Sequence, residues 1–200
     1  MSTIKTNQLA HTANGAATYT LPQTDGSAGQ VLKTDGSGNL SWTSSGKILQ
    51  VVSTTKKDTF SHASETPALI TGLTAAITPK FNTSKVLISI DLSASVGNTN
   101  YTVWFFLYKG GSEISGATGD AGAANQDRAF KAMRAYTTND AENISGMYLD
   151  SPSTTSATTY QVYMSVESGQ TGYINRMGAD SNVSYNPRTV SSITLEEVAA

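Results

Sequence analysis

Apolar residues recur at every second position through most of the chain after residue 47. In residues 84–95 the even-numbered positions from Val86 to Ala94 are all apolar, and residues 159–167 show the same alternation. Successive side chains of a strand point to opposite faces of a sheet, so this period of two predicts strands with one buried face. The pattern gives eight candidate strands: 47–54, 68–78, 84–95, 101–109, 128–136, 143–150, 159–167 and 189–198.

Turn residues separate these candidate strands. Pro79, Pro152 and Pro187 fall between apolar runs, where a missing backbone N–H breaks no strand pairing. Residues 120–135 are ambiguous, because Phe130 and Met133 could lie on one helical stripe. Residues 128–136 alternate as their neighbours do, which favours a loop followed by a strand. The predicted fold class is all-β, an antiparallel β-sandwich of the jelly-roll kind.

Residues 101–109 differ from the other candidates, because both of their faces are apolar. Val103, Phe105 and Leu107 would point one way, and Trp104, Phe106 and Tyr108 the other. A two-layer sandwich covers only one face of each sheet, and a large exposed aromatic face is unusual on a monomer. The face of Trp104, Phe106 and Tyr108 is therefore predicted to form an oligomer interface. A covering loop of the same chain is the alternative.

The first 46 residues differ in composition from the rest of the chain. They are rich in Gly, Ser, Thr, Asn and Asp, and the sequence Thr-Asp-Gly-Ser occurs twice, at residues 24–27 and 34–37. Asp-Gly and Asn-Gly are turn signals, since Gly accepts positive φ, and short strands fit between them. Hairpins of this size bury too little apolar surface to be stable alone. Residues 1–46 are therefore predicted to form an extended arm that lies against a partner, with a flexible leader as the alternative.

Composition limits the range of functions. Only 14% of the residues are charged and the net charge is -2, so no nucleic-acid partner is expected. The longest apolar run, residues 103–107, is too short to cross a bilayer, and residues 1–21 lack the apolar centre of a secretory signal. We therefore expect synthesis in the cytoplasm without membrane insertion. With no cysteine, stability is expected to come from packing or from association with other chains.

No catalytic residue, metal site or cofactor is predicted. The two histidines lie far apart in the sequence, whereas zinc ligands occur at close spacing. Glu196 and Glu197 would point to opposite faces of one strand, so they cannot act as a carboxylate pair. Asp120 and Asp127 flank a loop of small residues that could offer calcium ligands, but their spacing matches no known calcium loop, and solvation is the expected role.

Residues 21–42 read Leu-Pro-Gln-Thr-Asp-Gly-Ser-Ala-Gly-Gln-Val-Leu-Lys-Thr-Asp-Gly-Ser-Gly-Asn-Leu-Ser-Trp. This run resembles the linker of many tail-fibre and appendage proteins of tailed bacteriophages, especially marine and cyanobacterial ones. Residues 1–5, 46–52 and 192–199 are similar to that group as well. The resemblance implies a virion protein, commonly a homotrimer, with an N-terminal attachment segment and a C-terminal β-sandwich head. It implies no catalytic residues.

The sequence therefore predicts a non-enzymatic, homotrimeric fibre subunit located in the virion. The arm at 1–46 would dock to another virion protein, and the head at 47–200 would present its distal loops to a host glycan or protein. The residues expected to dock are Ile4, Leu9, Tyr19 and Leu21. The expected receptor contacts are Asn98, Asn100 and Tyr101 in the turn at 97–101, and Tyr173, Asn175 and Arg176 in the loop at 172–176. The loop at 110–125 is a further candidate.

Two other classes of function compete with this hypothesis. A capsid-decorating, cement or neck protein with a purely structural role would have nearly the same sequence pattern, because it too needs an arm and a β-rich head. A polysaccharide-degrading enzyme is disfavoured, because the chain has no convincing pair of carboxylates at the separation of roughly 5–10 Å that glycoside hydrolysis uses.

Overall fold

The structure is a computed structural model that describes residues 6–10, 18–44, 46–120, 122–123 and 126–199. The chain divides into two compact units, Met1–Lys47 and Ile48–Ala200. They are termed the N-terminal unit and the sandwich. This division falls beside the change of composition after residue 46.

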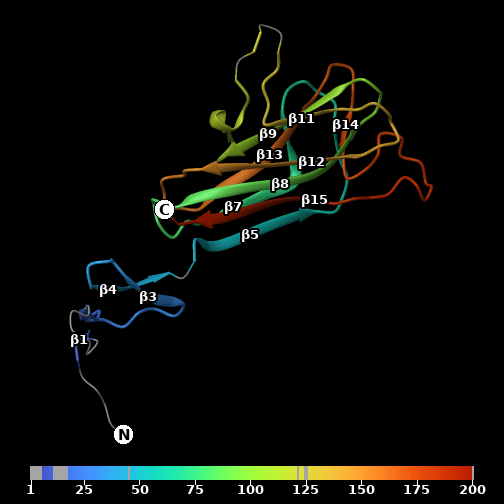
Figure 1. Cartoon of the computed structure of the whole chain (residues 1–200). Helices are drawn as coiled ribbons and strands as arrows, with labels where there is room; N and C mark the ends of the chain where they lie inside the picture. Colours follow the sequence, from blue (N-terminus) through green and yellow to red (C-terminus); the bar gives the residue numbers. More distant parts are fainter. Residues whose placement is uncertain (1–5, 11–17, 45, 121, 124–125, 200) are drawn as a thin grey trace. The chain divides into compact units, whose positions relative to one another are not determined.

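Eight antiparallel strands build the two sheets of the sandwich (Figure 1). One sheet has the order β7 (Ala68–Ile77), β13 (Thr158–Val166), β9 (Thr102–Lys109) and β11 (Lys131–Arg134). The other has the order β5 (Ile48–Lys56), β15 (Ser191–Val198), β8 (Lys85–Val96) and β12 (Glu142–Asp150). Counted along the chain, the eight strands follow the orders 2-7-4-5 and 1-8-3-6, which is the arrangement of a jelly roll.

Shorter elements extend the sheets. β10 (Ser112–Glu113) pairs with β9, and β14 (Gly172–Ile174) lies between β8 and β6 (Phe60–His62). The helical element among the described residues is a 3-10 turn, η1 (Ser115–Ala117). Within the described part of the chain, no helix is long and apolar enough to cross a bilayer.

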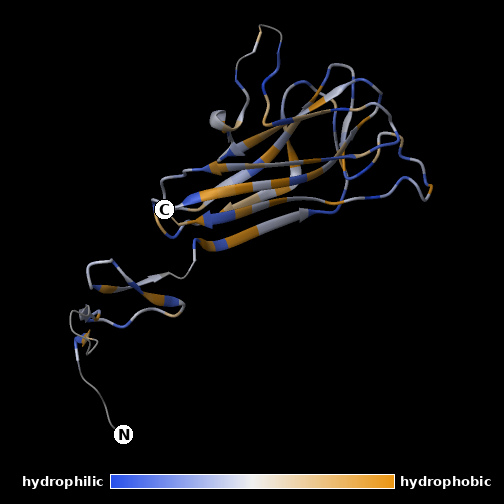
Figure 2. Ribbon diagram, viewed as in Figure 1, coloured by the Kyte–Doolittle hydropathy of each residue, from blue (hydrophilic) through white to orange (hydrophobic). Residues whose placement is uncertain are grey.

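The core lies between the two sheets and follows the predicted alternation. Figure 2 shows that hydrophobic stretches concentrate on the strands of the sandwich, while its loops are mostly hydrophilic. The inward residues of β8 and β13 are nearly inaccessible to solvent: Val86, Ile88, Ile90, Leu92, Ala94, Tyr160, Val162, Met164 and Val166 are all at most 3% exposed. Burial of these aliphatic side chains is the main force that holds the sheets together.

The predicted strands are confirmed, with ends that differ by at most three residues. The ambiguous segment forms a loop followed by the short strand β11, and no helix occurs in its described part. Met133 of β11 faces the core at 4% exposure, while its neighbours Ala132 and Arg134 are exposed. The alternation of buried and exposed residues therefore identifies this segment as a strand, as expected from the strands on either side of it.

The N-terminal unit consists of two small hairpins. β1 (Gln8–Ala10) pairs with β2 (Thr18–Thr20), and β3 (Gln30–Thr34) pairs with β4 (Leu40–Ser44). The Asp-Gly turn after β3 forms as its sequence predicts: the Asp35 carboxylate accepts hydrogen bonds from the backbone N–H groups of Ser37 and Asn39 and from the Asn39 side chain. These bonds hold the pKa of Asp35 below its usual value, the side chain of Asn39 contributing most.

Apolar side chains of the N-terminal unit remain largely exposed. Leu9, Val31 and Leu32 are 43–51% exposed, and Tyr19 is 40% exposed. Trp42 is 37% exposed, although its indole N–H donates to the Thr24 carbonyl over 2.8 Å. Two-stranded hairpins with so little buried surface are only marginally stable in water.

Candidate functional site

Strand direction assigns the loops of the sandwich to two ends. The sandwich begins at Ile48, which pairs with Val198 of the last strand, and the loops 78–84, 110–130 and 151–157 lie at that end. Four loops, 57–67, 97–101, 135–141 and 167–190, lie at the opposite end, toward the right of Figure 1. This opposite end is termed the four-loop end.

Backbone hydrogen bonds connect the loops of the four-loop end to one another. The N–H groups of Gly97, Asn100 and Ala179 donate to carbonyls of neighbouring loops or strand ends: Gly97 to Thr171 over 2.9 Å, Asn100 to Ala135 over 2.6 Å, and Ala179 to Thr138 over 2.8 Å. The structure thus brings together the two predicted receptor segments at 97–101 and 172–176. It places the third, at 110–125, at the other end.

Asn98 and Asn100 are both exposed on the β8–β9 turn. The Asn98 amide donates to the Gln170 side chain over 2.8 Å, and Asn100 has φ 67°, a conformation that Asn tolerates better than most residues. Tyr101 is half-buried and packs against the core. The two asparagines therefore present polar groups to solvent, while Tyr101 offers only part of its ring.

Tyr173 and Arg176 contact each other. The guanidinium carbon of Arg176 lies 4.1 Å from the centroid of the Tyr173 ring, a cation–π distance. Arg176 also donates to the carbonyls of Met177 and Gly178, and it forms an ion pair with Asp180 at 3.4 Å. Gly172–Ile174 is a strand rather than the expected loop, so these side chains mainly brace the chain that follows it.

Asn175 corrects one expectation. It is fully buried, and its amide donates to the carbonyls of Lys56 and Asp58 while its oxygen accepts from the Ser191 hydroxyl over 2.6 Å. A side chain without exposed surface cannot contact a receptor, so Asn175 is a structural residue. Its φ of 62° explains the need for Asn in the turn after β14.

Two exposed tyrosines at the four-loop end were not among the predicted contacts. Tyr136 is 77% exposed on the β11–β12 loop, and Tyr185 is 71% exposed on the loop between β14 and β15. Each is an isolated aromatic residue in a polar loop, and this pattern in the sequence could have marked them as candidate contacts. Exposed aromatic rings are typical contact residues of binding surfaces.

The outer face of β9 carries the predicted aromatic residues. Phe106 pairs across the sheet with Tyr163 of β13, whose ring stacks on Tyr108 at 3.8 Å between centroids. Phe106 is only 8% exposed, while Trp104 and Tyr108 are half-exposed. Burial raises the pKa of Tyr108, and the nearby Glu113 adds to the shift. Trp104, Phe106, Tyr108 and Tyr163 are termed the aromatic face, and its role as an oligomer interface stays a prediction.

The predicted docking residues lie in or beside the hairpins of the N-terminal unit. Leu9 and Tyr19 are direct cross-strand partners on β1 and β2, and both are exposed. Leu21 follows β2, is half-buried, and donates its N–H to the Asn7 carbonyl over 2.9 Å. Ile4 lies outside the described residues.

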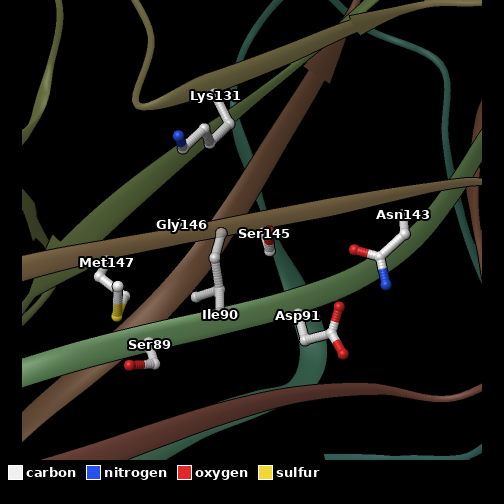
Figure 3. Close-up of a pocket in the computed structure, with 8 residues that line it drawn as sticks. All are labelled: Ser89, Ile90, Asp91, Lys131, Asn143, Ser145, Gly146 and Met147. Carbon is white, nitrogen blue, oxygen red and sulfur yellow. The ribbon is translucent and has the colours of Figure 1, made fainter.

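A shallow pocket of about 710 Å³ lies over β8 and β12. Figure 3 shows its eight lining residues: Ser89, Ile90, Asp91, Lys131, Asn143, Ser145, Gly146 and Met147. Asp91 and Asn143 extend from adjacent strands on one side of the view, and Ser89 and Met147 lie together on the other. In the pairing of the two strands, Ser145 lies opposite Asp91, and Met147 lies opposite Ser89. This site is termed the β8–β12 pocket.

Two buried carboxylates serve the fold rather than a reaction. Asp150 accepts a hydrogen bond from the Tyr160 hydroxyl over 2.6 Å and pairs with the Lys109 ammonium at 2.9 Å. Burial alone would raise the pKa of Glu197, but hydrogen bonds, including those from the Gln50 side chain and the Lys80 backbone, hold it below its usual value. Both groups have their partners within the protein.

Among the described residues, no three His, Asp or Glu side chains gather closely enough to hold a metal ion. Asp120 and Asp127 are exposed on the β10–β11 connection, part of which lies outside the described residues. The absence of a catalytic residue stays a prediction from the sequence.

No protein-family model and no curated protein sequence matches the chain. Among solved structures, the chain is similar to the structure of infectious bursal disease virus Gt strain, with 16% identity and a TM-score of 0.44 over 95% of this chain. It is also similar to the T=1 particles derived from the same virus, with 12% identity and a TM-score of 0.39 over 80% of this chain. The chain spans 46% and 39% of those viral chains. Both TM-scores lie below 0.5, and the likeness does not decide function.

Proposed function

We propose that the chain is a non-enzymatic structural protein of a virion, the subunit of a homotrimeric phage fibre that attaches the particle to its host. Residues 1–46 dock to another virion protein, and the sandwich presents its four-loop end to the host surface. The observation that carries this proposal is the exposure of apolar side chains on all four strands of the N-terminal unit, β1 to β4. These side chains need a partner that covers them.

The arrangement of the sandwich supports different roles for its two ends. The chain enters the sandwich at Ile48, and the four-loop end lies at the far ends of the strands. Within the sandwich, the loops with Tyr136 and Tyr185 therefore lie at the end remote from this entry point. The resemblance of residues 21–42 to phage fibre linkers points in the same direction.

Homotrimerisation through the aromatic face is tested with the purified full-length chain. We expect light scattering to give the mass of a trimer, and we expect Trp104→Glu to give a monomer, because a carboxylate cannot be buried between apolar faces without a partner. Met147→Glu is the matched control, since Met147 is 70% exposed on the other sheet. A monomeric wild-type chain, or a trimer that survives Trp104→Glu, contradicts this interface.

Attachment is tested on particles that carry the variant chain. Replacing Tyr136 and Tyr185 together by Ala is expected to reduce adsorption to host cells, while Phe81→Ala is not. Phe81 is 50% exposed and lies in the β7–β8 loop at the opposite end of the sandwich. Unchanged adsorption with the double variant removes the four-loop end as the contact surface. Particles that adsorb normally without the chain, but lose integrity, assign it the capsid-decorating or neck role instead.

A further inference from the structure

We propose that the β8–β12 pocket binds the hydroxyl groups of a neutral saccharide. This inference rests on the proposed attachment role and adds a second contact, on the side of the sandwich rather than in its loops. Asn143 is the second residue of β12, the strand that follows the loop 135–141 of the four-loop end. The pocket therefore borders the surface proposed to meet the host.

Polar groups of the pocket lack partners within the described protein. No hydrogen bond joins the side chains of Ser89, Asp91, Asn143 or Ser145 to another described residue. Hydroxyls nearby behave differently, because Ser53 bonds Thr194 over 2.8 Å, and Thr189 donates to Ser93 over 2.8 Å. The pocket thus concentrates donors and acceptors that only an external ligand or water can satisfy.

The chemistry of these groups fits a sugar. A carboxylate, an amide and two hydroxyls line the pocket, and they can accept from and donate to the hydroxyl groups of a sugar. Met147, 70% exposed beside them, offers an apolar surface to the C–H groups of the ring. Mixed apolar and polar linings of this kind are typical of small-ligand sites.

Charge favours a neutral ligand over an acidic one. The pocket has one anion, Asp91, and one cation, Lys131, so their formal charges cancel. Gly146 makes room for the cation: a Cβ at this position would lie 2.5 Å from the Lys131 side chain and 2.9 Å from the Phe130 ring. A larger residue would displace Lys131 from the pocket wall.

A shallow pocket implies weak binding at each copy. A dissociation constant near 1 mM corresponds to only about 4 kcal/mol, and several copies on one particle convert such contacts into firm adhesion. The pocket therefore needs no high affinity to serve attachment.

The test is an NMR titration of the isotope-labelled full-length chain with four neutral sugars: glucose, galactose, mannose and N-acetylglucosamine. We expect at least one of them, at millimolar concentration, to shift amide resonances of residues 89–91 and 143–147. Asp91→Asn and Asn143→Ala are expected to weaken this binding by ~10-fold, the typical effect of losing a hydrogen bond to a charged or buried group. Asp127→Asn, which removes an exposed carboxylate outside the pocket, is expected to change nothing.

Other outcomes overturn the proposal. No shift with any of the four sugars, shifts confined to other residues, or equal binding by Asp91→Asn would each remove the pocket as a saccharide site. Shifts with glucuronate alone would replace the neutral ligand by an acidic one. If the pocket fails while the Tyr136 and Tyr185 double variant still loses adsorption, attachment stands without this site. If the sugar binds but adsorption never depends on the chain, the attachment role itself is wrong.

Discussion

Tyr160→Phe removes a single hydroxyl from the interior of the sandwich and tests how its two sheets are joined. Tyr160 of β13 is fully buried, and its hydroxyl donates over 2.6 Å to Asp150 of β12, in the opposite sheet. Asp150 is 6% exposed and keeps only the Lys109 ammonium, at 2.9 Å, when the hydroxyl is lost. The substitution therefore removes one hydrogen-bond donor from the buried Asp150 carboxylate.

The expected cost follows from that geometry. A hydrogen bond to a charged group contributes about 1.5–3 kcal/mol to folding. In a domain of this size each kcal/mol moves the midpoint of thermal unfolding by about 2–4 °C, so Tyr160→Phe is expected to lower it by about 3–12 °C. Calorimetry or circular dichroism of the purified chain at neutral pH measures this shift.

Alkaline pH supplies a second readout. Burial, followed by the bond to Asp150, raises the pKa of Tyr160 far above the ordinary 10.0. The folded chain then keeps this proton while the unfolded chain loses it, so the stability advantage of wild type over Tyr160→Phe is complete below pH 10 and declines as the pH rises above it. Phe has no proton to lose, so the free energies of unfolding of the two proteins converge.

Tyr163→Phe is the matched control for this experiment. Tyr163 lies on the same strand, and its hydroxyl makes no hydrogen bond to a described residue, while its ring stacks on Tyr108. We expect its midpoint to stay within about 1 °C of wild type, because the ring and its stacking on Tyr108 are kept and no hydrogen bond to a described residue is lost. Equal midpoints for the two variants would refute the argument that the Tyr160–Asp150 bond joins the sheets.

Two further substitutions test buried polar groups. Glu197→Gln is expected to reduce stability at neutral pH by about 1–3 kcal/mol, since the amide cannot accept from both the Gln50 side chain and the Lys80 backbone. Because the folded-state pKa of Glu197 is lowered, its contribution is lost as the pH falls below 4.5, and urea titrations of the two proteins should converge in acid. Asn175→Ala is expected to cost about 3 kcal/mol or more, because it removes the donor to the buried Lys56 carbonyl and the partly buried Asp58 carbonyl, and the acceptor of the Ser191 hydroxyl. The exposed Asn98→Ala should cost under about 1 kcal/mol in the same urea titration, and equal costs would contradict this account.

The positions of the eight main strands followed from the sequence, because a half-buried strand imposes a strict period of two on its residues. Residues 84–95 and 159–167 show it most clearly, and their inward residues are the ones that the core excludes from solvent. Asp-Gly turns were equally readable, since the Asp35 turn depends on hydrogen bonds within five consecutive residues. The surroundings of individual loop residues could not be predicted from the sequence.

Asn175 shows why. Its sequence context, a Tyr-Ile-Asn-Arg segment, is that of an ordinary polar loop, and nothing nearby in the chain reveals that Lys56 and Asp58 will meet its amide. Those partners lie more than one hundred residues away. The same holds for the β8–β12 pocket, whose residues come from three strands that only the pairing of the sheets brings together.

By itself, the sequence determined the local features of this protein: its strands, their buried faces, its tight turns and the change of texture at residue 46. These depend on the alternation of side chains along a strand and on the backbone freedom of Gly and Asn. Only the tertiary structure decided the strand order, the loops that share one end, the burial of Asn175 and the grouping of Asp91 with Asn143 and Lys131. Each of these depends on contacts between residues far apart in the chain, which no local pattern encodes.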